Sequence, residues 1–464
     1  KDFLTFVRFM NKIFLKSSKT LIFFLGLFFL VNYSCDKKED DPFTTSGDQL
    51  LLPRIEITTE ATIVDEPKIP AEMQIISDEY PIESQQIGIE YRGSSSQMFP
   101  KKSYGFETWT KDNQDMDVSI GGYPEEEDWI LYAPYTDKSL VRNVIIYELS
   151  NNIGRYATKT SFYELFINDD YKGVYVLMEK IKRDKNRVAI SKNNDADISG
   201  GYIIKIDKAT GDGGNYNSYN SFESKINDNG KIYFLYEYPD EDDITSNQKD
   251  YIQQYVHDFE SSLYSESFLD PETGYKNYVD FESLIDFFLL NEISKNIDGY
   301  RLSTFMYKEK GGKLTLGPIW DFNLAFGNAN YCQGEKPQGW VYQFNNVCPD
   351  DWWQVPFWWE RFMEDPEFKA AIKTRWNELR SSAFSNNSIL DRISAIEQML
   401  HEHNAIERNF SKWSILGEWI WPNYFVGDPQ SSIGVAQAYK QETNYLKSWI
   451  IDRLQWMDGQ ISQF

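Results

Sequence analysis

The apolar residues of this 464-residue chain change their spacing near residue 240. Before that point they form short runs broken by prolines, such as PRIEITTE, AEMQIIS and QIGIEYR, and the alternation in IGIEYR is typical of a β-strand. After Ile244 they recur at helical spacing, and one earlier helix is predicted over residues 140–153. The pattern predicts an α+β protein of two lobes, strand-rich over about 51–240 and helix-rich over about 241–464, with a cleft between them.

Two aspartates, Asp298 and Asp321, lie at the two ends of a predicted β-hairpin. Residues 303–308 (STFMYK) and 313–316 are the expected strands, and Gly311-Gly312 supplies the turn. The hairpin brings both carboxylates to one end, where they suit a site that holds a divalent cation and takes a proton from a hydroxyl. The alternative is that each aspartate caps a turn or a helix.

A loop of small residues, Arg92-Gly93-Ser94-Ser95-Ser96, lies between two predicted strands, and Lys101 and Lys102 follow it. Such a loop can offer N–H groups and hydroxyls to phosphates while a lysine neutralises their charge. The alternative is that it is only a turn. Glu148 lies on the early helix, where it either pairs with a lysine or is a solvated surface charge.

The first 34 residues have the pattern of an export signal. Lysines precede an apolar run over residues 21–31, which is short for a membrane-spanning helix, and Cys35 follows it closely. A cysteine in this place resembles the lipobox of bacterial lipoproteins, and the charged residues after it resemble the export tether of surface lipoproteins in Bacteroidetes-type bacteria. The resemblance implies that Cys35 is lipidated, that residues 35–50 form a tether, and that the chain is anchored in the outer membrane facing either the periplasm or the outside.

The charge of the chain and its few cysteines and histidines limit the partners and the kinds of site that it can have. The formal charge of −24 argues against a nucleic acid, or an anionic membrane surface, as a partner of the protein body, so membrane contact is expected through the lipid anchor only. Two further cysteines, Cys332 and Cys348, lie near one another, and outside the cytoplasm this favours a disulfide over free thiols. With three histidines in the chain, a histidine triad or a zinc site has little material.

Seven motifs occur in an order that resembles the CotH family of atypical protein kinases, first associated with spore coats. They are R-G-S-S-S at 92–96, P-K-K-S-Y at 100–104, W-x-L-x-x-P-Y-x-D-x-S-L-x-R-N at 129–143, E-L-F-I-N-x-x-Y-K-G-V-Y-x-L-x-E at 164–179, G-G-Y-I-I-K-I-D at 200–207, N-x-D at 296–298 and G-P-I-W-D-F-N-L-A-F-G-N at 317–328. The resemblance covers roughly residues 50–380. It implies a protein-kinase-like fold that binds ATP in the cleft between two lobes.

The resemblance also implies roles for the two aspartates. Asp298 matches the catalytic aspartate, which orients the acceptor hydroxyl or accepts its proton. Asp321 matches the aspartate that holds Mg²⁺ against the phosphates. Two positions depart from the pattern. Ser303 stands where ordinary kinases have a second metal-binding Asn, and Asn323 stands where many relatives have a second acid.

Further nucleotide contacts follow from the same match. Arg92, Gly93 and Ser94 are expected to cover the phosphates. Lys102, with Lys101 as the alternative, is expected to contact a phosphate and to be oriented by Glu148. Glu179, at the connection between the lobes, is expected near the nucleotide.

Three functions are therefore considered. The first is an ATP- and Mg²⁺-dependent kinase that phosphorylates Ser or Thr of a cell-envelope or surface protein. The second is a weak or inactive lipoprotein of the same fold that binds a glycan or protein partner, using the Trp-rich segment 340–359 as a stacking platform. The third, glycoside hydrolysis by the paired acids, has little support because neither acid lies in an evident apolar pocket.

Overall fold

The computed structural model describes residues 51–464 except 211–213 and 228–229. Cys35, the expected signal and the expected tether lie outside the described residues. Residues 50–464 form one compact unit. None of the helices in the described part of the chain has the length and apolar character needed to cross a membrane.

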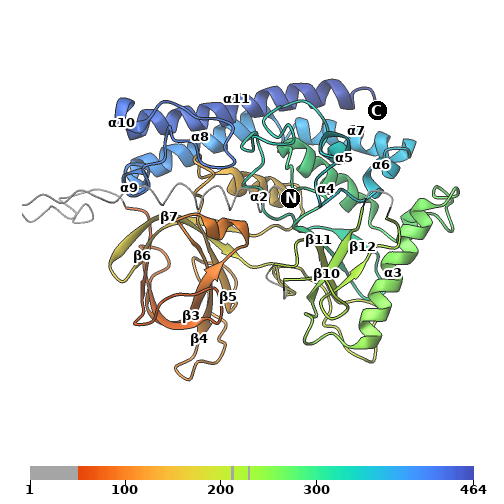
Figure 1. The fold of residues 1–464 in the computed structure, drawn as a ribbon, viewed down its shortest axis with the longest axis horizontal. Helices are drawn as coiled ribbons and strands as arrows, with labels where there is room; N and C mark the ends of the chain where they lie inside the picture. Colours follow the sequence, from red (N-terminus) through yellow and green to blue (C-terminus); the bar gives the residue numbers. More distant parts are fainter. Residues whose placement is uncertain (1–50, 211–213, 228–229) are drawn as a thin grey trace, which may run out of the picture. The chain divides into compact units, whose positions relative to one another are not determined.

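Seven strands of the first half close into a barrel (Figure 1). Neighbouring strands pair antiparallel in the order β1-β2-β3-β4-β5-β7-β6, and a parallel pairing of β1 with β6 closes the ring. Alternate residues point inward, so that Ile55, Phe106 and Leu177 are buried in a core of their own. The bounds are β1 Arg54–Thr58, β2 Ile69–Ile76, β3 Ile82–Arg92, β4 Ser103–Trp109, β5 Asp128–Tyr132, β6 Thr160–Ile167 and β7 Asp170–Glu179.

A second sheet combines strands from both halves of the chain in the order β12-β11-β8-β10-β9. The predicted hairpin is confirmed, because β11 (Thr304–Lys308) pairs antiparallel with β12 (Leu314–Leu316). Its other neighbour is β8 (Tyr202–Ile206), which is followed in the sheet by β10 (Tyr233–Tyr238) and β9 (Ser221–Glu223). The sheet therefore joins strands from both sides of the division expected near residue 240.

Helices dominate the second half, as the periodicity predicts, and the early helix is confirmed as α2 (Arg142–Asn152). Figure 1 shows α7, α8, α9 and α11 on one side of the barrel and the second sheet, with α2 and α4 between them. Nearly every residue of α4 is buried, so it forms the centre of the large core. The bounds are α3 Ser246–Tyr264, α4 Phe281–Ser294, α5 Phe344–Val347, α6 Trp358–Phe362, α7 Pro366–Arg380, α8 Asn386–Glu402, α9 Ala405–Lys412, α10 Gln430–Ile433 and α11 Val435–Ile461, with short 3₁₀ turns η1 Ser95–Met98, η2 Tyr275–Asn277 and η3 Val341–Gln343.

The Trp-rich segment is mainly core. Trp358 and Trp359 are buried, and Trp340 packs edge-on against Trp456. Trp352, in contrast, is 71% exposed. Cys332, which precedes this segment, and Cys348, which lies within it, form a disulfide with their Cα atoms 5.7 Å apart.

A buried ion pair attaches the barrel to the helices. Arg408 of α9 donates from Nε and Nη2 to the two carboxylate oxygens of Glu164 on β6, at 2.8 and 2.7 Å. Tyr171 also donates to this carboxylate, at 2.8 Å. Burial makes the pair intolerant of losing one member, because the remaining charge would be left without compensation.

We predict that Arg408→Met lowers the free energy of unfolding by about 3 kcal/mol or more, since it strands the buried Glu164 carboxylate. Arg392→Met is the matched control. It breaks an equally well-formed pair with Glu148, at 2.6 Å, in which the arginine side chain is half exposed, and should cost less than about 1 kcal/mol. Urea unfolding of both variants tests this, and equal costs would contradict it.

Candidate functional site

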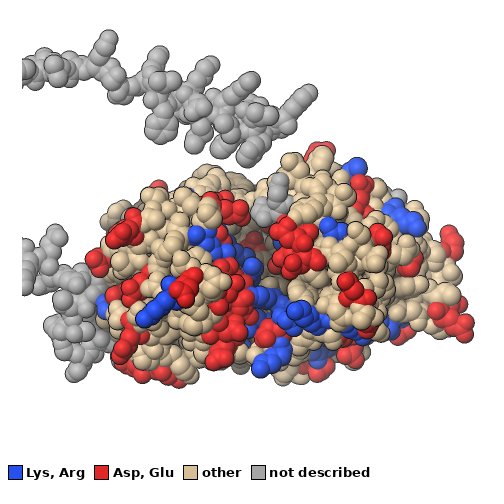
Figure 2. Space-filling view, turned by 90° about the horizontal axis from the view of Figure 1, so that it is seen from below, with Lys and Arg blue, Asp and Glu red and all other residues tan. Residues whose placement is uncertain are grey.

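A pocket of about 620 Å³ is lined by the end of β3 and the loop after it, the end of β8, and the segments that flank the β11–β12 hairpin. Asp298 and Asp321 both line it, as do Arg92, Gly93 and Ser94. The structure thus gathers five residues that the sequence assigned to one site. In Figure 2, charged side chains of both signs gather where the barrel meets the second sheet.

The backbone at Asp321 is fixed by α2. Asp321 has a left-handed φ of +61°, which costs a residue with a side chain about 1 kcal/mol or more. Its N–H donates to Tyr147 Oη at 3.0 Å, and the N–H of Phe322 donates to Asn143 Oδ1 at 2.8 Å. Tyr147 also stacks on Trp320, with ring centroids 6.0 Å apart. These contacts hold the strained backbone and so determine where the Asp321 carboxylate lies.

Asp298 is held by the loop that follows α4. Arg301 Nη2 donates to Asp298 Oδ1 at 2.8 Å, and the Asp298 N–H donates to Asn296 Oδ1 at 3.3 Å. The Arg301 guanidinium is itself buried and also binds Asp351. The Asp298 side chain keeps 18% of its surface exposed, so the carboxylate is oriented and still accessible from the pocket.

A third acid, Asp207, lines the same pocket, and no role is predicted for it from the sequence. It follows β8, the strand beside the hairpin, and Ser303 Oγ donates to its Oδ2 at 3.3 Å. The N–H of Lys208 donates to Oδ1 at 2.8 Å. The signal that could have found it is a carboxylate at the end of the apolar strand in GGYIIKID.

The neighbouring acids affect the ionisation of Asp321. Burial, with the neighbouring charges of Asp298 and Asp207, raises the pKa of Asp321 to about 7, although Lys208 and Arg92 oppose the shift. Burial also raises the pKa of Asp207. Crowded carboxylates with raised pKa values favour a bound cation, and the donor set of carboxylates with the pocket-lining amide Asn323 fits a divalent cation.

Positively charged and small residues line the same pocket. The Arg92 guanidinium lies over the Trp320 ring, 5.4 Å from its centroid. Gly93 has a φ of +105°, and a Cβ there would meet Ser96 Oγ at 2.0 Å, so the tight turn requires glycine. Ser94 Oγ accepts a hydrogen bond from Thr210 Oγ1 at 2.9 Å. Lys205 and Lys208 line the pocket as well, and these positive groups fit phosphates.

The two lysines predicted to contact a phosphate do not line the pocket. Lys102 Nζ donates to the carbonyl of Gln97, and Lys101 is buried, donating to the carbonyl of Val174 at 2.7 Å and to Asn409 Oδ1 at 2.9 Å. Burial lowers the pKa of Lys101 well below its usual value. Neither lysine is among the residues that line the pocket.

Glu148 is not the partner of Lys102, which corrects the predicted pair. Its carboxylate accepts two bonds of 2.6 Å from Arg392 on α8. The reason is the helical turn. Asn143 and Tyr147, four residues apart on α2, face Asp321 and Phe322, and the next residue therefore points to a different side of the helix.

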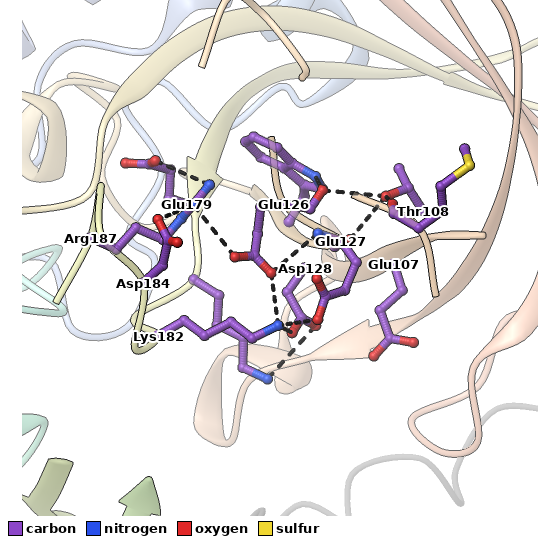
Figure 3. Close-up of polar contacts among 12 residues, drawn as sticks. Glu107, Thr108, Glu126, Glu127, Asp128, Glu179, Lys182, Asp184 and Arg187 are labelled. Carbon is purple, nitrogen blue, oxygen red and sulfur yellow. Dashed lines mark hydrogen bonds and ion pairs between the residues drawn. The ribbon is translucent and has the colours of Figure 1, made fainter. Parts of the chain in front are cut away.

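Glu179 is also outside the pocket lining and lies in a network at the end of the barrel (Figure 3). It is fully buried, accepts from the N–H of Lys159 at 3.1 Å and lies 3.3 Å from Arg187 Nη2. Its neighbour Met178 lines the pocket instead.

The same network contains an acidic group of metal-binding dimensions, Asp117, Glu126 and Glu127. Figure 3 shows Lys182 beside Glu126, Glu127 and Asp128, where its ammonium contacts Glu126 at 2.7 Å, Asp128 at 2.9 Å and also Glu127. Lys182 therefore already neutralises part of the charge of this group.

The raised pKa of Asp321 predicts how stability depends on pH in metal-free buffer. Folded Asp321 keeps its proton up to about pH 7, whereas the unfolded side chain loses it near 3.8, so this residue increasingly opposes folding as the pH rises between these values. Asp321→Asn should therefore stabilise the protein by about 2–4 kcal/mol at pH 8 and have little effect at pH 4. Urea unfolding with chelator at pH 4, 6 and 8 measures this. The exposed Asp350→Asn serves as control, and a difference that does not change with pH would contradict the prediction.

Comparison with known proteins identifies the family of this chain. No match was found among curated proteins. A family model described as CotH kinase protein matches residues 89–457, a range that includes Arg92, Asp207, Asp298 and Asp321. The match covers most of the chain, and the chain therefore belongs to the CotH kinase protein family.

Proposed function

We propose that this chain is an ATP- and Mg²⁺-dependent protein kinase that transfers a phosphoryl group to a Ser or Thr hydroxyl of a cell-envelope protein. The observation that carries the proposal is the convergence of Asp298, Asp321 and the Arg92-Gly93-Ser94 loop on one pocket. Phosphoryl transfer depends mainly on alignment of the reactants and on neutralisation of the phosphate charge. These residues include groups that can orient the reactants and groups that can neutralise charge.

Each side of the pocket has a distinct role in this proposal. Asp298, oriented by Arg301, accepts the hydrogen bond of the acceptor hydroxyl and takes its proton as the oxygen binds the γ-phosphorus, while the bond from this phosphorus to the bridging oxygen breaks and ADP leaves. Asp321 and Asn323 would hold Mg²⁺, which neutralises charge on the phosphates when bound. Arg92, with the N–H groups of its loop, would contact the phosphates.

The remaining lining suits the base of a nucleotide. Ile130, Tyr132 and Met178, from β5 and β7 and the residues beside them, line the pocket on the barrel side. An apolar surface with few polar groups is typical of sites for aromatic ligands. The proposal thus treats the barrel and the helix-rich part of the chain as the two lobes of a kinase-like fold, with the nucleotide between them.

A glycan platform on residues 340–359 is less well supported. Trp358 and Trp359 are buried in the core, where Trp359 stacks on Phe287, and so they present no surface to a sugar. The expected anchor at Cys35 would place the kinase at the outer membrane, where its acceptor would be a protein of the cell envelope.

The first test is transfer of labelled γ-phosphate to the protein itself or to envelope proteins. We expect Asp298→Ala and Asp321→Ala each to reduce transfer at least about 100-fold, because one removes the proton acceptor and the other the cation ligand. Asp350→Asn should retain activity. If the wild type shows neither transfer nor a nucleotide-induced rise in melting temperature, the proposed function is wrong.

The second test decides which lysine serves the phosphates. Because Lys208 lines the pocket and Lys102 does not, Lys208→Met should weaken Mg-ATP binding about tenfold or more, and Lys102→Met less than about threefold. Calorimetric titration of a non-hydrolysable ATP analogue measures both affinities. The reverse order would mean that Lys102 turns into the pocket when nucleotide binds.

A further inference from the structure

We propose that Asp207 is a ligand of a second divalent cation in this pocket, supplying the metal-binding group that Ser303 does not. The inference rests on the proposed kinase function and adds a residue to it. Protein kinases hold two Mg²⁺ ions, and the second is bound by an Asn of the catalytic loop. Here the corresponding residue, five positions after Asp298, is Ser303, whose neutral hydroxyl is a poor ligand.

Sheet register places Asp207 beside that position. Ile206, the last residue of β8, pairs with Thr304, the first residue of β11. The residues just outside this pair are Asp207 and Ser303, and they meet through the hydrogen bond of 3.3 Å from Ser303 Oγ to Asp207 Oδ2. The carboxylate therefore lies next to the side chain whose metal-binding role it would take over.

Hydrogen bonds orient Asp207. The Lys208 N–H donates to its Oδ1 at 2.8 Å, and its own carbonyl accepts from Tyr216 Oη, also at 2.8 Å. The neighbouring cations have further partners: Lys205 Nζ donates to Glu237 at 2.8 Å, and Lys208 Nζ lies 5.0 Å from the centre of the Trp353 ring. Asp207 is thus a fixed carboxylate on the pocket wall.

The three pocket acids do not converge on a single cation position. Ligand oxygens of a single Mg²⁺ lie about 2.1 Å from it, so two of them are at most about 4.2 Å apart. Asp207, Asp298 and Asp321 do not form a group with all ligand atoms within 4.8 Å, since among the described residues Asp117, Glu126 and Glu127 form the one group that does. One cation could not take all three carboxylates. Two cations would each take one or two, with phosphate oxygens and water completing the shell, as is usual for Mg²⁺.

Counting bound Mn²⁺ tests the inference. Mn²⁺ replaces Mg²⁺ in oxygen sites and is visible by electron paramagnetic resonance. With a non-hydrolysable ATP analogue at saturation, the wild-type protein should bind two Mn²⁺ ions, Asp207→Asn one, and the control Asp350→Asn two.

The melting temperature of the metal-free protein distinguishes a metal-binding role of Asp207 from a structural role. If Asp207 serves the second cation, Asp207→Asn relieves repulsion with Asp321, and the metal-free protein should melt at the same or a higher temperature while losing the part of the Mn²⁺-dependent rise that the second ion supplies. If the carboxylate only holds the loop, the metal-free protein should melt at a lower temperature with the Mn²⁺ response intact, which would overturn the inference.

The number of bound Mn²⁺ ions also distinguishes failure of the second cation site from failure of the proposed kinase function. Two ions bound to both the wild type and Asp207→Asn, or a single ion bound to the wild type, would overturn the second site and leave the proposed kinase function in place. A wild-type protein that binds neither the nucleotide analogue nor Mn²⁺ would overturn both.

Discussion

The site depends on α2, which holds the backbone of Asp321 in a conformation it would not otherwise keep. Tyr147 and Asn143 accept the two N–H groups of this turn, and the residue before Asn143 secures the helix itself. The buried Arg142 bonds to Asp137 Oδ1 at 2.6 Å and donates to the carbonyl of Ala325 at 3.1 Å. Contacts from α2 thus hold the turn both at Asp321 and at Ala325, and a shift of α2 would move the Asp321 carboxylate.

The same helix end connects the barrel to the last helix. Tyr439 of α11 donates to the carbonyl of Ser139 at 2.9 Å, and Lys138 lies 3.8 Å from Glu442, whose pKa burial raises to about 7. Charged groups are buried here only because each has a partner, so the position of α2 is specified more strictly than apolar packing would specify it. The pocket geometry is therefore a consequence of how the barrel is attached to the helices.

Local patterns were enough to predict the hairpin and its two aspartates. The β-forming residues of STFMYK and the adjacent glycines specify the strands and the turn without help from the rest of the chain. Asp207 could not be found in this way, because its contact with Ser303 joins residues 96 positions apart through a strand pairing that no local pattern encodes. The direction of Lys101 depends on Asn409, 308 positions away, so the sequence could not show which lysines face the pocket. The α+β class was predictable because periodicity is local, whereas the sheet that joins β8 to β11 depends on long-range pairing.

The pocket is lined by charges of both signs, and under the proposed function this makes its ligands depend on each other. A triphosphate alone would be repelled by Asp207, Asp298 and Asp321, and a divalent cation alone would be repelled by Arg92 and Lys208. A cation–phosphate complex would find partners of opposite charge for both of its parts, in a site where burial strengthens each interaction. In a chain with a formal charge of −24, the proposed function requires these positive side chains to offset the repulsion of an anionic nucleotide. Binding of metal and nucleotide should therefore be strongly cooperative, with each raising the affinity for the other.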